Sequence, residues 1–199
     1  MKNDGKKSPE PQPVAKTPPA SPATERDATF RNAVYEERQG IIDRIEAARI
    51  AGDAKELLQL LIAEIELFTR ELKMETLMLF EATERGQAGR QMMRNVPAHL
   101  AIVPSFIVQS FFAAPDTHDV VELSVGESQA NALAKRLDNF DSIRNEFAQA
   151  ASQLAATWDD KPECDLEHLV AIDRHRSEVK HAAFDLCRFI DTLANLVAG

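Results

Sequence analysis

A stretch of 21 residues without a charged side chain is the feature that most constrains the fold of this chain. Residues 95–115 (NVPAHLAIVPSFIVQSFFAAP) contain no Asp, Glu, Lys or Arg, although 28% of the whole chain is charged. Such a segment is stable only where its apolar surface is removed from water. It must therefore be covered by the chain's own helices, by a partner or by a lipid bilayer.

The sequence on both sides of this segment has the periodicity of amphipathic helices, because apolar residues recur every three to four positions. The pattern predicts four long helices, at about 24–51, 53–85, 127–158 and 163–197. Gly52 ends the first helix, and Asp53 with Glu56 three residues later is typical of a helix N-terminus. We therefore expect the first two helices to form a tight hairpin.

The region between the second and third long helices is predicted to be irregular. Gly86 to Gly89 should end the second helix, and Pro97 and Pro104 should break the charge-free segment into short helices. Residues 120–125 (VVELSV) favour a brief strand or an extended linker. Ser124 and Glu127 have the spacing of a capping box for the next helix.

These elements predict an all-α fold: a bundle of about four long helices, arranged as two helical hairpins with a kinked apolar connection. Residues 1–24 hold six of the ten prolines and almost no large apolar side chains. We expect this part to be a disordered Pro/Lys-rich arm, because it cannot bury enough surface to fold. Residues 25–199 are then a single helical domain.

The charge distribution bears on the class of partner. The chain has a net charge of −9; residues 1–24 carry +2, so the remainder carries −11. Because an acidic body repels a phosphate backbone, nucleic acid is not expected as the main ligand. Two cysteines, Cys164 and Cys187, fit a reducing compartment, so we expect a cytoplasmic protein.

The charge-free segment is the first candidate for a partner surface. Only 13 of its 21 residues are apolar, and two are prolines, so a role in the core is favoured over membrane contact. If a partner covers it instead, clustered aromatic and aliphatic side chains would carry the contact. The expected partner-binding residues are Phe106, Ile107, Phe111 and Phe112, with Arg85 and Arg90 beside the Gly86–Gly89 turn.

Catalytic and metal sites are only weakly indicated. Glu178 and His181 form a Glu-x-x-His pair, the spacing with which a helix directs two ligands at one metal. A di-iron bundle needs two such pairs, and the chain has one. The segment Gly126–Ala130 resembles a nucleophile elbow only faintly, because Ala130 replaces the second glycine and no parallel sheet is expected. We therefore expect no cofactor.

The leading hypothesis is a non-enzymatic helical interaction protein that acts as an adaptor, regulator or assembly factor. The partner would be another protein, and the heptad-like apolar seams are equally compatible with a homo-oligomer. One alternative is a metal-binding helical bundle that uses Glu178, His181 and carboxylates of the second helix from Glu64 to Glu84. Another is peripheral membrane association through Phe106 to Ala114.

Overall fold

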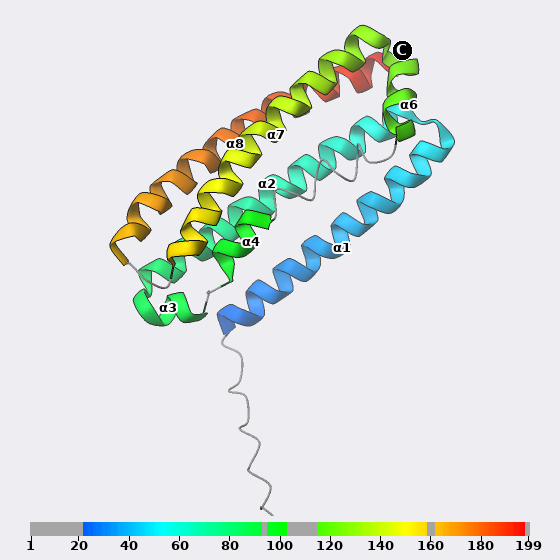
Figure 1. Cartoon of the computed structure of the whole chain (residues 1–199). Coiled ribbons are helices and arrows are strands. Elements are labelled where there is room, and N and C mark those ends of the chain that lie inside the picture. The colour runs from blue at the N-terminus through cyan, green and yellow to red at the C-terminus, as the bar shows by residue number, and fades with distance from the viewer. Residues whose placement is uncertain (1–21, 93–94, 103–114, 159–161, 198–199) are drawn as a thin grey trace, which may run out of the picture.

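The predicted all-α fold is confirmed by the computed structural model, which describes residues 22–92, 95–102, 115–158 and 162–197. Throughout these ranges the chain forms helices joined by turns, without a strand (Figure 1). Within the described ranges, four helices are long, at 30 to 36 residues each, and three are short. They are α1 (Pro22–Ala51), α2 (Ala54–Glu84), α3 (Gly86–Met92), α4 (Val96–Ile102), α6 (Pro115–Val125), α7 (Glu127–Thr157) and α8 (Pro162–Val197).

The long helices form two antiparallel hairpins, α1–α2 and α7–α8, as predicted (Figure 1). The first hairpin turns at Gly52, whose φ of 68° requires a glycine. The Asp53 side chain then accepts a hydrogen bond from the backbone N–H of Glu56, which caps α2. Because α2 and α7 run in the same direction, residues 85–126 must return along the bundle to join them.

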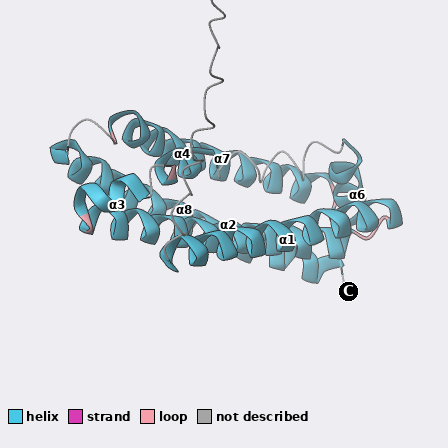
Figure 2. Cartoon of the chain, turned by 90° about the horizontal axis from the view of Figure 1, so that it is seen from below, coloured by secondary structure: helices cyan, strands magenta, loops and turns pink. Residues whose placement is uncertain are grey.

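The core lies where α8 packs along both α2 and α7. The helix α1 packs mainly on α2, and the view from below shows these two side by side, with α7 and α4 across the molecule (Figure 2). The Phe68 ring of α2 meets Phe140 of α7 edge-on, with 6.2 Å between the ring centres. The predicted apolar seams of α2, α7 and α8 are the faces that meet in this core.

Part of the charge-free segment forms α4, which packs against α7 and α2. Val96 and Leu100 are 2% and 0% exposed, so this part of the segment contributes to the core. Phe106, Ile107, Phe111 and Phe112 lie outside the described residues, as does the predicted arm up to residue 21. The interface expected at those phenylalanines therefore stays a prediction.

Within the described residues, no helix combines the length needed to span a lipid bilayer with sufficient hydrophobicity.

The prediction of a strand or an extended linker at 120–125 is wrong, because these residues form the second half of α6. Val121 is buried whereas Leu123 is 88% exposed, so one face of this helix packs and the other faces solvent. The predicted capping box is also wrong. Ser124 donates its hydroxyl to the Val120 carbonyl within α6, and Gly126, with φ 85°, occupies the N-cap position of α7 without a side-chain cap.

The Gly86–Gly89 segment ends α2, as predicted, but it then continues into the short helix α3 rather than a turn. Gly86 adopts φ 64°, which reverses the chain after α2. The chain then folds back so closely that a Cβ on Gly89 would lie 2.3 Å from the Ala82 carbonyl oxygen. Glycine at position 89 is therefore required by packing against α2.

Candidate functional site

Three glutamates of α2 are buried, although charged residues of an amphipathic helix ordinarily face solvent. Glu64, Glu71 and Glu75 are 3%, 5% and 0% exposed. The sequence-based interpretation assumed one apolar face, but α2 contacts α1, α4 and α8 and is covered around most of its circumference. Buried carboxylates are costly unless they are paired, so their partners decide what they do.

Two arginines of α1 pair with these carboxylates. Arg38 donates from Nε to Glu64 and from Nη2 to Glu71, each at 2.8 Å. Arg31 makes a two-pronged contact with Glu75, at 2.6 and 2.7 Å. Burial raises the pKa of Glu64, and the opposing effect of Arg38 does not fully offset it. The α1–α2 contact is thus built around buried ion pairs.

His99 extends this network to α4. Its Nε2 atom lies 3.4 Å from Glu75 Oε1 and 3.7 Å from Glu71 Oε1, distances of ion pairs rather than good hydrogen bonds. Burial acts to raise the pKa of Glu71, but His99 and Arg38 outweigh it and hold that pKa below its usual value. With every carboxylate facing a cation, the network serves to clamp α1 and α4 onto α2.

A groove with an apolar floor lies between α2 and α8. Its volume is about 490 Å³, and Ile65, Leu72 and Ala183 lie at its base. The Phe184 side chain forms part of its wall and is 63% exposed, although an exposed phenylalanine ring is unfavourable in water. The Arg188 guanidinium lies 5.8 Å from the centre of that ring.

The rim of the groove is basic, although the chain is acidic overall. Arg70 and Lys73 come from α2, Arg176 and Lys180 come from α8, and Glu66 is the acidic residue among those that line the groove. Arg70 pairs with Glu37 of α1, and Arg176 pairs with Asp173 of its own helix. Within the described part of the chain, Lys73 and Lys180 have no ion-pair partner, so their charges are available to a ligand.

The thiol of Cys187 also faces the groove, but it is not set up as a nucleophile. Burial, with a smaller contribution from the nearby Glu66 carboxylate, raises its pKa to about 11. The reactive form of cysteine is the thiolate, which such a pKa disfavours near neutral pH. Covalent catalysis through Cys187 is therefore disfavoured.

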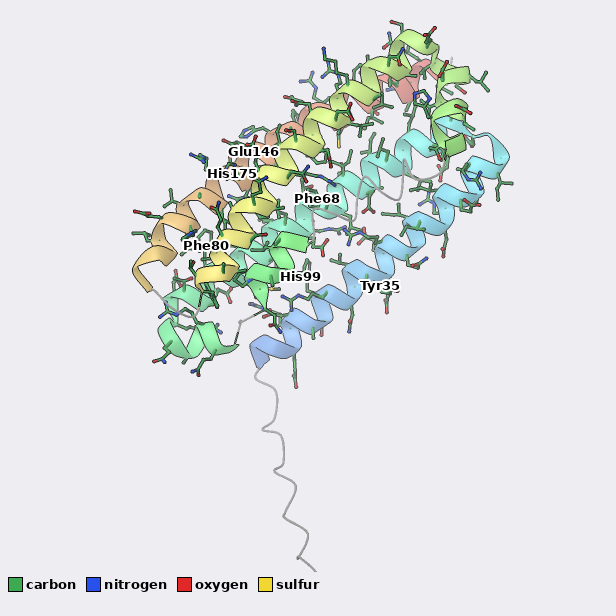
Figure 3. All side chains as sticks on the ribbon, viewed as in Figure 1. Tyr35, Phe68, Phe80, His99, Glu146 and His175 are labelled. Carbon is green, nitrogen blue, oxygen red and sulfur yellow. The ribbon has the colours of Figure 1, made fainter. Side chains whose placement is uncertain are left out.

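The Glu178–His181 pair does not form in this structure. The His181 ring contacts the Ser177 carbonyl through Nδ1 at 2.7 Å, whereas Glu178 contacts His175, with 2.8 Å between Oε2 and Nδ1. Glu146 of α7 completes this cluster at 3.9 Å from the same His175 nitrogen (Figure 3). The contact between His175 and Glu178 could have been predicted from their i, i+3 spacing on one helix. The position of Glu146 could not, because it depends on how α7 packs on α8.

The Glu146–His175–Glu178 cluster has donor atoms within 4.8 Å of one another, which is a metal-compatible spacing. However, Arg174 lies 3.1 Å from Nε2 of His175 and donates to it, which assigns the ring proton to Nδ1. That proton points at Glu178, so the Nδ1 lone pair is not free for a metal. The cluster is best described as a polar contact between α7 and α8.

The two predicted basic residues flank the corner between α2 and α3. Arg85 is the C-cap residue of α2 and lies 3.6 Å from Glu81. The backbone carbonyl of Arg90 accepts a hydrogen bond from the Trp158 indole at 3.4 Å. The second contact holds α3 against the end of α7, and the partner-binding role of both arginines stays a prediction.

No protein-family model, curated protein or solved structure gives a significant match to this chain.

Proposed function

We propose that this chain is a non-enzymatic helical interaction protein that docks a partner protein in the groove between α2 and α8. The observation that carries the proposal is Phe184, a large aromatic side chain left 63% exposed beside an apolar floor. Interface anchors are typically aromatic side chains set in apolar pockets and surrounded by polar rims. The basic rim and the protonated thiol of Cys187 fit a binding surface better than an active site.

The rest of the fold supports this role by holding the groove rigid. Its two walls belong to α2 and α8, which pack together along the core, while the buried ion pairs to Arg31 and Arg38 fix α2 from the other side. A preformed groove loses little conformational entropy when a partner binds. The phenylalanines at 106, 111 and 112 remain a second proposed contact region.

Replacing Phe184 with aspartate should weaken partner binding by at least about tenfold, because an aromatic anchor is exchanged for a hydrated charge. The measurement is affinity capture from cell extract, followed by titration of the purified partner against both forms of the full chain. Because Phe184 is exposed, the free energy of unfolding should change by less than about 0.5 kcal/mol.

The matched control is Tyr35→Asp, since Tyr35 is a comparably exposed aromatic residue, 69% accessible, on α1 (Figure 3). This variant should retain every partner that the unmodified chain captures. If a folded Phe184→Asp variant captures the same partners with the same affinity, docking in this groove is wrong.

A further inference from the structure

We propose that the occupant of the groove is an amphipathic α-helix of the partner protein, with an apolar face flanked by Asp and Glu side chains. This inference rests on the proposed docking function and specifies the chemistry of the partner. It is carried by two features of the groove, the sign of its rim charge and its position between two long helices.

The charge of the rim selects an acidic ligand. Lys73 and Lys180 stand on opposite walls of the groove and have no ion-pair partner among the residues described. A carboxylate on each side of a bound segment would therefore face an available ammonium group, whereas Arg70 and Arg176 are already paired with Glu37 and Asp173. Although the whole chain has a net charge of −9, the positive charge at this groove favours contact with an acidic segment over contact with a basic one.

The shape of the groove selects a helix. Its walls are two neighbouring antiparallel helices, and the furrow between such helices accepts the apolar ridge of a third. The apolar floor formed by Ile65, Leu72 and Ala183 lies between the basic side chains. A helix with one apolar stripe and acidic flanks would fit this arrangement. Its stripe would lie on the apolar floor and against Phe184, and its acidic flanks would lie beside the basic rim.

The test uses two synthetic peptides of about 18 residues, or five helical turns. Both carry the same leucine stripe, and one has Glu where the other has Lys on the flanking positions. Fluorescence anisotropy with the full chain should show the acidic peptide binding at least about tenfold more tightly than the basic one. Its affinity should fall as salt concentration rises, because the rim contacts are solvent-exposed.

Two variants separate the charge preference from the docking site itself. Lys73→Glu with Lys180→Glu should remove or reverse the preference between the peptides, whereas Phe184→Asp should weaken the acidic peptide without favouring the basic one. If both peptides bind equally and both depend on Phe184, the groove docks helices but the acidic partner class is wrong. If binding of neither peptide depends on Phe184, the docking function fails as well.

A second copy of the chain is the alternative occupant, and mass measurement distinguishes it. Light scattering after size-exclusion chromatography should give a monomer for the unmodified chain without peptide. A dimer that dissociates in the Phe184→Asp variant would overturn the inference in favour of self-association.

Discussion

Replacing Arg38 with methionine is expected to lower the free energy of unfolding by about 3–5 kcal/mol, the typical loss when one partner of a buried ion pair is removed. Arg38 is the shared donor to Glu64 and Glu71, and both carboxylate side chains are no more than 6% exposed. Without the guanidinium, two buried carboxylates lose their arginine partner in the contact between α1 and α2. Chemical denaturation at neutral pH measures the effect.

The pH dependence of this loss provides an internal check. Without Arg38, burial should raise the pKa of Glu64 further above its unfolded value, and the pKa of Glu71 should also rise because only His99 then opposes burial. A group with a raised folded pKa favours the folded state at low pH, so the difference between variant and unmodified chain should shrink as pH falls towards about 4.3. Arg44→Met is the matched control, because its contact with Glu56 is largely solvent-exposed and should contribute at most about 1 kcal/mol. An equal loss in both variants would mean that the buried network does not hold α1.

Replacing Phe68 with alanine is expected to destabilise the fold by a similar amount, about 3–5 kcal/mol. The Phe68 side chain is fully buried on α2, and it packs edge-on against Phe140 of α7. Its loss leaves a cavity where the two hairpins meet. The midpoint temperature of thermal unfolding should fall by roughly 6–20 °C for a chain of this size.

The control for this change is Phe184→Ala, which removes the same side chain from an exposed position on α8. It should alter the free energy of unfolding by less than about 0.5 kcal/mol. A small loss for Phe68→Ala, comparable with that of the control, would show that the two hairpins do not pack through this aromatic pair.

The long helices could be predicted from the sequence because their signals are local. The apolar seam of α7, from Leu133 to Trp158, follows one face of a helix, and that face is buried. Gly52 and Asp53 mark a turn through backbone freedom and capping, both properties of neighbouring residues. The short helix α6 could not be predicted because a six-residue apolar pattern does not separate helix from strand.

The buried network could not be predicted because it depends on how α1 lies against α2. The turn at Gly52 brings arginines of α1 opposite glutamates of α2. The resulting pairs are Arg26 with Glu81, Arg31 with Glu75 and Arg38 with Glu71. This alignment is readable in the sequence only if the hairpin register is known. Glutamates at helical spacing, taken alone, look like a solvent-facing stripe.

The groove was missed for a related reason. Lys73 and Lys180 lie more than a hundred positions apart in the sequence, and they line one groove only because α2 and α8 are neighbours. Phe184 in isolation resembled any apolar residue of a helix that packs in a bundle. Its exposure is determined by which faces of α8 remain after α2 and α7 have been packed.

Site-specific photo-crosslinking tests the proposed docking function most directly. A photoreactive phenylalanine analogue placed at position 184 should give a discrete crosslinked product with a partner protein in living cells. The same analogue at position 35, on an equally exposed part of α1, should give none. Equal products from both positions, or no product from position 184, would contradict docking in the groove between α2 and α8.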